Sequence, residues 1–467
     1  MRFPEKFAVL FLIILFLWLR FFNLSESFRF TGDPGRDMLV LWDWRETGKP
    51  PLLGPQTSAL PINQSAIYFY FLYPAFLISN GNPLSANVTV AVFWIIMFVA
   101  ILWALRNRAE LQRVALVVLF LSAIHPLFVE QTRMVWNPSF LPPLLATSLI
   151  AFFLLIEKYS RTRLWIFSFS TALAVSLHFP VGALALACVL YLAIFNKEQL
   201  GKVIPVIVVS LVFINLPTIV FEARHGFLIT KSVLQGGWIG LTQFTRWENF
   251  RRLIDFTGGL PYLWMSSVLL FGAVSFAVWK TTRQKRSLAE TIGFLLVMTA
   301  GLTIISGLAF HSHYAFGTAI LLFFLISQLP TKIRIVILII LAVVWLNPRQ
   351  INTYIAPAGR TLEEEMACFA NFCSKEKETV FVSAQYGESP FHVGYEYRYL
   401  MKQAGCDVKY IESQPEKAEK MAVVVDGSTY EHGKTSYYEL TLFGQSEEAG
   451  KYECGNELDV IILKKNN

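Results

Sequence analysis

The sequence predicts an all-α polytopic membrane domain of about 11 spans, followed by a small α/β domain. The first observation is composition, because 54% of the 467 residues are hydrophobic and only 16% are charged, whereas soluble domains carry roughly 25% charged residues. The second is a series of apolar runs long enough to cross a bilayer. The third is that basic residues recur in every second connection between those runs. We therefore expect a membrane domain over 1–346 and a soluble domain over 347–467.

The apolar runs define the expected spans, because roughly 20 residues of helix cross about 30 Å of hydrocarbon. The first run covers 7–22. The bulky Phe21 and Phe22 stand where a signal peptide would need a small-residue cleavage site, so we interpret this run as an uncleaved span. The other expected spans cover 84–105, 114–128, 140–156, 164–177, 181–195, 203–221, 263–279, 291–310, 316–329 and 333–346.

Basic residues in alternate connections predict the orientation of the chain. By the positive-inside rule, the side that carries them faces the cytoplasm. The N-terminus is then cytoplasmic and the C-terminal domain extracytoplasmic, as expected for a protein of a bacterial or archaeal plasma membrane. The long segments 23–83 and 222–262 also lie on the outer side, which marks it as the working face. The basic residues are Arg2, Lys6, Arg106, Arg108, Arg113, Lys158, Arg161, Arg163, Lys197, Lys202, Lys280, Arg283, Lys285, Arg286, Lys332 and Arg334.

The region 347–467 has a higher charge density and shorter apolar runs than the rest of the chain. Helices are predicted over 361–373 and 390–404. Short buried strands are predicted where β-branched residues cluster, which completes a small α/β domain. These strands cover 379–383, 408–411, 422–425 and 460–463.

Four cysteines, Cys368, Cys373, Cys406 and Cys454, fall in this C-terminal domain. Disulfides persist outside the cytoplasm, so we expect crosslinks here. Four cysteines allow three pairings, and the sequence does not choose among them. Free buried thiols are the alternative. Cys188 falls in an expected span and is interpreted as a packing residue.

The first outer loop, 23–83, contains an acidic turn directly after the first span. The turn places Asp33, Arg36 and Asp37 within five residues. It is followed by an expected surface helix over 36–46, a proline-rich connector and a short aromatic helix that begins near Tyr68, as is typical of a segment at the lipid headgroups. The alternative is a plain turn in which Asp33 caps the helix.

This loop resembles the first loop of the GT-C membrane glycosyltransferases. It is most similar to glycosyltransferase family 39, which includes the protein O-mannosyltransferases and the lipid A aminoarabinose transferases. Other stretches agree with the resemblance, among them Ser-Ala-Ile-His-Pro at 122–126 and Thr-Arg-Met-Val-Trp-Asn-Pro-Ser at 132–139. Leu216-Pro217, followed by Phe-Glu-Ala-Arg-His-Gly-Phe at 221–227, agrees as well.

The resemblance implies a GT-C fold and transfer of a sugar from a polyprenyl-phosphate donor to a lipid, glycan or protein acceptor on the outer face. It also implies that Asp33 is the general base, which takes the proton of the acceptor hydroxyl. The sequence departs from the family pattern because Pro34 replaces the glutamate that usually follows, and Asp37 is the candidate second carboxylate. One base and one leaving group imply a single inverting displacement.

Further candidate residues lie on the same outer segments, since a cation there can stabilise the leaving phosphate. For each arginine, snorkelling to the headgroups is the alternative. The candidates for the donor phosphate are Arg224, His225, Arg133 and Arg246, and those for the substrate are Arg36, Glu222, Tyr68 and His311.

No cofactor is expected. His311 and His313 form a His-x-His pair, but no carboxylate or cysteine stands beside it, so a divalent metal is not favoured. His178, beside Pro180, is interpreted as a hydrogen-bonded residue at the end of a span. The sequence contains no Walker loop, nucleotide-binding glycine fingerprint or zinc spacing. The net charge of +7 is spread over short clusters, which does not fit a nucleic-acid partner.

Two other function classes remain open. An O-antigen polymerase or ligase also uses polyprenyl-linked sugar, but depends on outer arginines and histidines rather than on an acid in the first loop. Comparing the activity of an Asp33 variant with that of an Arg224 variant distinguishes this class of enzyme from the base-catalysed glycosyltransferase. A lipid-linked sugar transporter predicts mid-membrane ionisable residues and internal repeats, and the sequence has few of the former and no clear repeat.

Overall fold

The computed structural model describes residues 3–57, 62–235, 245–260, 264, 267–268, 271–272, 274–275, 288–306, 310–386, 394–428, 430 and 438–466. The chain forms two compact units. The first unit consists of Met1–Phe22, Pro51–Phe71 and Asn87–Tyr354. The second consists of Asn23–Pro50, Leu72–Ala86 and Ile355–Asn467. Parts of the first outer loop therefore fold together with the C-terminal region.

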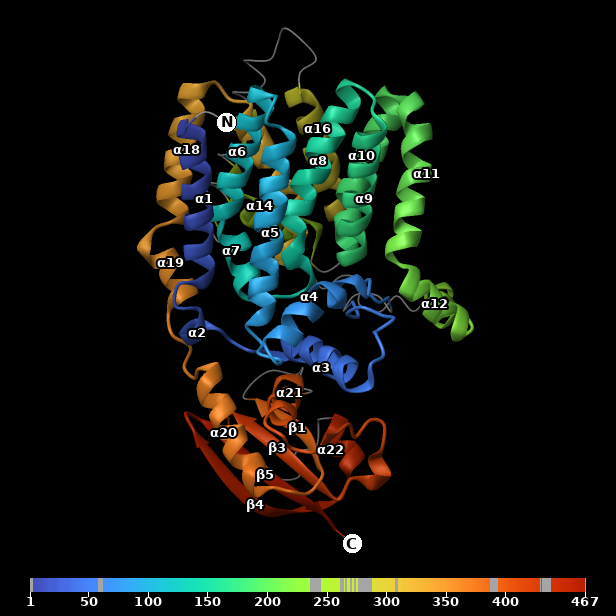
Figure 1. Ribbon diagram of the computed structural model, residues 1–467, viewed down its shortest axis with the longest axis vertical. Helices are drawn as coiled ribbons and strands as arrows, with labels where there is room; N and C mark the ends of the chain where they lie inside the picture. The colour runs from blue at the N-terminus through green and yellow to red at the C-terminus, as the bar shows by residue number, and fades with distance from the viewer. Residues whose placement is uncertain are drawn as a thin grey trace. The chain divides into compact units, whose positions relative to one another are not determined.

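The first unit is a bundle of apolar helices that run side by side (Figure 1). Helices α8 and α9, α9 and α11, α10 and α16, and α6 and α17 pack against each other. Many of the exposed side chains on these helices are Ile, Val, Leu and Phe, as required of a surface that meets lipid rather than water. The helices are α1 (Phe3–Phe21), α5 (Ser85–Ala104), α6 (Ala109–Ile124), α7 (Pro126–Arg133), α8 (Leu141–Glu157), α9 (Arg161–Leu177), α10 (Gly182–Phe195), α11 (Lys197–Ile214), α12 (Leu216–Arg224), α13 (Leu228–Leu234), α14 (Arg246–Gly258), α16 (Leu288–Ile305), α17 (Phe316–Ser327), α18 (Thr331–Trp345) and α19 (Pro348–Ile355).

By length and composition, three described helices are long and apolar enough to cross a membrane, and up to six if each bent pair is one span. Four shorter apolar helices accompany them. The expected spans therefore recur as helices, although the described residues alone do not reproduce the count of about 11. The expected span 263–279 lies mostly outside the described residues. The protein is an integral membrane protein.

Two predicted spans are bent rather than continuous. The run 114–128 divides into α6 and α7, which meet at 61°, and the run 203–221 divides into α11 and α12, which meet at 65°. Each second helix begins with a proline in its first turn, Pro126 and Pro217. Proline lacks the N–H that would continue the helix and restricts the residue before it, so the chain turns at that point. Hydropathy alone does not reveal these bends.

The second unit contains a five-stranded sheet of order β2-β1-β3-β5-β4. β1 pairs in parallel with β2 and β3, and β5 pairs antiparallel with β3 and β4. The predicted α/β domain is confirmed, but β4 was missed because its sequence is polar and most of its residues are exposed at the sheet edge. The strands are β1 (Val380–Tyr386), β2 (Val408–Lys409), β3 (Lys420–Asp426), β4 (Ser446–Gly455) and β5 (Leu458–Lys465).

Helices α3 (Gly32–Thr47), α20 (Leu362–Lys375), α21 (Tyr395–Gln403) and α22 (Tyr438–Phe443) complete this unit, together with the short α2 (Leu24–Ser27). α3 lies against α21. Their contact includes Lys402 of α21, whose Nζ lies 2.7 Å from Asp43 Oδ1 and 3.0 Å from Glu46 Oε2.

The four cysteines of the C-terminal region form the disulfides Cys368–Cys454 and Cys373–Cys406, one of the three pairings that the sequence left open. The second bridge joins the last turns of α20 to Cys406, two residues before β2, across 33 positions. We expect the double variant Cys373→Ser, Cys406→Ser to lose about 2–4 kcal/mol of stability in this unit, because the unfolded chain regains the entropy of the open loop. Hydrogen exchange of β1 peptides in the full-length protein measures this loss. Non-reducing peptide mapping that finds Cys373 joined to Cys368 would contradict the pairing.

Candidate active site

The acidic turn of the first outer loop forms the first turn of α3. Thr31 is the N-cap, so Asp33 lies inside the helix rather than capping one that begins at Arg36. Arg36 Nη1 contacts Asp33 Oδ1 at 2.8 Å, and Arg36 Nη2 contacts Asp37 Oδ1 at 2.8 Å. The side chain of Asp33 is 55% exposed, whereas that of Asp37 is 1% exposed. Of the two predicted carboxylates, therefore, only Asp33 can meet a substrate, and Asp37 anchors Arg36.

Gly35 brings this turn against the backbone of α21. A Cβ at Gly35 would lie 2.4 Å from the backbone nitrogen of Glu396, closer than real side chains approach. Only glycine fits such a contact between two helices. The position of Asp33 is therefore set by α21, more than 350 residues along the chain.

Glu396 is a buried acid at this contact that sequence reasoning missed. It is 5% exposed and accepts a hydrogen bond from the hydroxyl of Tyr386. Burial raises the pKa of Glu396, and the charges of Asp426 and Asp33 act in the same direction. Its position within the predicted helix 390–404 carries no signal of this role, because only the tertiary fold brings it to α3.

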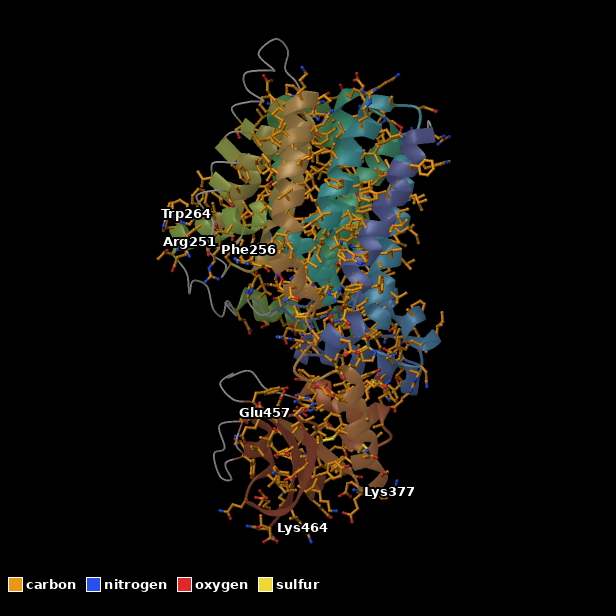
Figure 2. The ribbon with its side chains drawn as sticks, turned by 90° about the vertical axis from the view of Figure 1, so that its left-hand side faces the viewer. Arg251, Phe256, Trp264, Lys377, Glu457 and Lys464 are labelled. Carbon is orange, nitrogen blue, oxygen red and sulfur yellow. A yellow bond between two sulfur atoms is a disulfide. The ribbon has the colours of Figure 1, made fainter. Side chains whose placement is uncertain are left out.

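A cavity of about 730 Å³ opens in the second unit beside the N-cap of α3. Two aromatic side chains of its lining, Tyr386 and Tyr397, stack with ring centroids 5.9 Å apart. Its lining carries more carboxylates than cations. The lining residues are Phe28, Arg29, Phe30, Thr31, Ala358, Gly359, Arg360, Leu362, Glu365, Tyr386, Glu396, Tyr397, Asp426, Asn456 and Glu457, and Figure 2 labels Glu457.

One ion network lines this cavity. Arg360 Nε contacts Glu365 Oε1 at 2.8 Å, and Arg360 Nη2 contacts Asp426 Oδ1 at 3.0 Å. Tyr397 donates a hydrogen bond to Asp426 Oδ2 at 2.6 Å. Burial raises the pKa of Glu365 to about 7, although Arg360 opposes the shift.

The Glu365 carboxyl makes the second unit sensitive to pH. Because its folded pKa is raised from 4.5 to about 7, its protonated form stabilises the fold fully below pH 4.5, and this stabilisation of up to about 3 kcal/mol is lost as the pH rises through 7. Hydrogen exchange of β1 and β3, corrected for intrinsic rates, is expected to accelerate over this range. Glu365→Gln removes the dependence, whereas Glu363→Gln, an exposed change on the same helix, keeps it. If Glu365→Gln shows the same pH profile as the wild-type protein, Glu365 is not the group that makes this unit sensitive to pH.

In the first unit, the structure brings three predicted residues together at the C-terminal end of α12. Arg224 ends this helix and His225 follows it, both with exposed side chains. Glu222 is buried and accepts hydrogen bonds from the backbone N–H groups of Ile229 and Thr230, each at 2.9 Å. Glu222 thus fixes the turn that leads into α13. Phe227, the N-cap of α13, lies in this turn and has a φ of 61°. Glu222 shapes the segment that presents Arg224 and His225.

Three other predicted residues of the first unit lie apart from that turn. Arg133 is buried, and its Nη1 donates to the carbonyls of Leu19 and Arg20, each at 3.1 Å, at the end of α1. Tyr68 is 1% exposed and packs its ring against aromatic neighbours. Arg246 is the first residue of α14 and is exposed. Figure 2 labels Arg251 and Phe256 further along that helix.

His311 belongs to a cluster of imidazoles. Its ring stacks with that of His313 at a centroid distance of 5.5 Å, and the ring of His313 lies 4.4 Å from that of His178. Among the described residues, no group of three or more His, Cys, Asp or Glu side chains is arranged to hold a metal ion.

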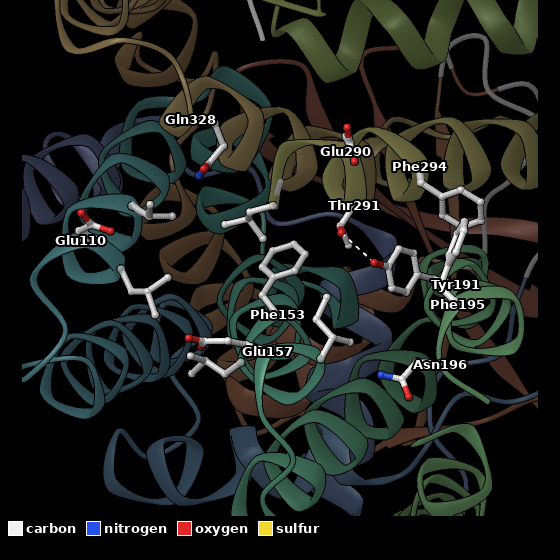
Figure 3. Close-up of a pocket in the computed structure, with 15 residues that line it drawn as sticks. Glu110, Phe153, Glu157, Tyr191, Phe195, Asn196, Glu290, Thr291, Phe294 and Gln328 are labelled. Atoms are coloured by element: carbon white, nitrogen blue, oxygen red, sulfur yellow. Dashed lines mark hydrogen bonds between the residues drawn. The ribbon is translucent and has the colours of Figure 1, made fainter. Parts of the chain in front are cut away.

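A separate cavity of about 690 Å³ lies in the first unit and contains none of the predicted site residues. Figure 3 shows the hydrogen bond of 3.0 Å between Tyr191 and Thr291 in its wall. Three glutamates, Glu110, Glu157 and Glu290, line it next to apolar side chains. It lies beside connections that are predicted to face the cytoplasm, so it is not a candidate for chemistry at the outer face.

Comparison with known proteins identifies the fold. No protein-family model and no curated protein matches the sequence. Two crystal structures of ArnT from Cupriavidus metallidurans match nearly the whole chain. The structure bound to undecaprenyl phosphate aligns with a TM-score of 0.63 at 11% identity and covers 97% of both chains. The apo structure aligns with a TM-score of 0.63 at 12% identity and covers 98% of both. The predicted GT-C fold with a small C-terminal sheet domain is confirmed.

Proposed function

We propose that the protein is an inverting membrane glycosyltransferase that takes a sugar from a polyprenyl-phosphate donor. The observation that carries the proposal is the exposed Asp33 in a turn fixed by Arg36, on a fold shared over 97% of the chain with a protein solved with undecaprenyl phosphate. The acceptor is a lipid, glycan or protein at the outer face of the membrane, in a bacterial or archaeal plasma membrane.

In the proposed reaction, Asp33 takes the proton of an acceptor hydroxyl while the hydroxyl oxygen attacks the anomeric carbon. The bond between that carbon and the phosphate oxygen breaks, and its electron pair leaves with the polyprenyl phosphate. A single displacement inverts the anomeric configuration. Asp37 and Arg36 hold Asp33 in place, which preserves the alignment on which such catalysis depends.

Cations are proposed to stabilise the negative charge that grows on the phosphate. Arg224 and His225 are the strongest candidates among the predicted residues, because both are exposed at the end of α12, just before a turn that Glu222 fixes. Arg246 is exposed as well. Arg133 contributes less directly to this stabilisation, because its guanidinium donates to the carbonyls at the end of α1. The buried Tyr68 supports the fold of the site through packing.

The test is transfer by the purified full-length protein from a panel of radiolabelled polyprenyl-phosphate sugars to candidate acceptors. We expect at least one donor to release polyprenyl phosphate together with a labelled product of inverted anomeric configuration. Retained configuration would refute the single displacement. The absence of release with every donor, from protein that stays folded, would count against the enzyme and in favour of a transporter.

A further inference from the structure

The cavity of about 730 Å³ in the second unit opens at the carboxyl-terminal edge of the sheet. β1 and β3 are parallel neighbours, and their last residues, Tyr386 and Asp426, pair in register and both line the cavity. The strand order is β2-β1-β3, so the chain leaves β1 for β2 on one side and returns to β3 on the other. In open α/β sheets, ligands bind beyond the carboxyl ends of the strands where the order reverses in this way. The position of the cavity in the fold therefore indicates a binding site.

The cavity has the size and the aromatic wall of a site for a small ligand. Its volume of about 730 Å³ falls within the range of roughly 300–1,000 Å³ that is usual for small-molecule sites. The partly exposed ring of Tyr386 stacks on the buried ring of Tyr397, with an interplanar angle of 30°. The hydroxyl of Tyr386 is bound to Glu396, so both ends of this side chain are held. A tyrosine held in this way offers an apolar face of fixed orientation beside a polar tip.

The polar groups of the lining are mostly hydrogen-bond acceptors. Glu365 is 8% exposed and accepts a hydrogen bond from Arg360 through Oε1, which leaves Oε2 for a ligand. Asp426 is held by Arg360 and Tyr397. Ionised carboxylates only accept hydrogen bonds, whereas a hydroxyl group can donate as well as accept. A ligand with several hydroxyl groups therefore matches this lining.

The charge of the lining disfavours an acidic ligand. Among the described residues that line the cavity, the acidic ones are Glu365, Glu396, Asp426 and Glu457 and the basic ones are Arg29 and Arg360. Arg360 already pairs with two of these acids. A phosphate or carboxylate group on the ligand would lie beside carboxylates that Arg360 does not neutralise, and like charges placed together select against a partner.

We propose that this cavity binds a sugar of the acceptor that carries hydroxyl groups and no acidic group. The inference rests on the proposed function and deepens it, because it names the chemical class of the acceptor. Thr31, the N-cap of α3, lines the cavity. A Cβ at Gly32 would lie 3.7 Å from Glu396 Oε2, so the lining also reaches the residue before Asp33. A sugar held in the cavity lies beside the turn that carries the proposed base.

The first test measures binding by the full-length protein in nanodiscs whose lipids carry no sugar. Ligand-observed NMR titrations use the methyl glycosides of glucose, mannose and galactose and those of the three corresponding uronic acids. We expect saturable binding of at least one neutral glycoside and none of its uronic acid. Tyr386→Ala is expected to weaken this binding at least about 10-fold, because it removes the aromatic wall. Tyr452→Ala, on β4 and outside the lining, is expected to bind as wild type does.

The second test reverses one charge of the lining without touching a buried group. Glu457 is exposed at the cavity (Figure 2), so Glu457→Lys is expected to fold as wild type does, even if Tyr386→Ala does not. The variant is expected to bind the uronic acid that wild type excludes, because an ammonium group replaces a carboxylate. The control is Glu453→Lys on β4. The side chain of Glu453 is 75% exposed and outside the lining, so this variant is expected to exclude the uronic acid still.

Four results would overturn the proposal. They are the absence of saturable binding of every neutral glycoside, equal binding of the neutral and acidic glycosides by wild type, an equal loss in Tyr386→Ala and Tyr452→Ala, and continued exclusion of the uronic acid by Glu457→Lys. Failure of the proposed function is distinguishable from these, since the protein then binds the glycosides as expected but transfers sugar from no polyprenyl-phosphate donor.

Discussion

Asparagine in place of Asp33 is expected to lower the rate of sugar transfer by about 10²–10⁴-fold, the usual contribution of a general base. Asparagine keeps an oxygen for the contact with Arg36, whose Nη1 lies 2.8 Å from Asp33 Oδ1, so the turn is expected to stay folded. The amide cannot accept the acceptor's proton at neutral pH. We therefore expect kcat to fall while the affinity for polyprenyl phosphate stays within a few-fold of wild type.

The control for Asp33→Asn is Asp43→Asn. Asp43 lies on the same helix, is 43% exposed and pairs with Lys402 rather than with the acidic turn. Its substitution is expected to leave the transfer rate within a few-fold of wild type. If Asp33→Asn transfers sugar at the wild-type rate while Arg224→Ala abolishes transfer, the base is wrongly assigned and the arginine-dependent polymerase or ligase reaction is favoured.

Much of the fold could be predicted from local sequence, because a bilayer imposes long apolar helices and a buried sheet imposes apolar strands. The helix over 361–373 and the strand over 422–425 recur as α20 and β3. The polar edge strand β4 could not be predicted, since its exposed residues produce no apolar run. The bend at Pro126 was missed because this proline stands inside an otherwise continuous hydrophobic run.

The residues of the candidate site also divide into those that local sequence indicates and those that it does not. Asp33 and Arg36 were found because their contact joins residues of one helical turn, which a sequence motif can encode. The role of Glu222 at α13 was local as well, but its backbone hydrogen bonds leave no residue-type signal. Glu396 and the pair His178 and His313 depend on contacts between segments more than 100 residues apart, so no spacing in the sequence could indicate them.

Alanine at Gly35 is expected to lower sugar transfer by about 10²-fold and to destabilise the second unit, while alanine at Gly32 is expected to change neither by much. A Cβ at Gly35 would lie 2.4 Å from the backbone nitrogen and 2.5 Å from the Cα of Glu396. Backbone atoms cannot rotate away, so α3 and α21 must separate, which moves Asp33. A displacement of about 1 Å is enough to cost roughly 10² in rate.

The comparison with Gly32 isolates this contact. Both glycines occupy the first turn of α3, and both gain helix propensity on substitution by alanine. A Cβ at Gly32 would meet only Glu396 Oε2, at an ordinary 3.7 Å. Transfer rates and hydrogen exchange of α3 and α21 in the two full-length variants measure the difference. If Gly35→Ala and Gly32→Ala behave alike, the close approach of α21 does not position Asp33. If only Gly35→Ala loses both protection and rate, the helix contact inside the second unit is what holds the catalytic turn.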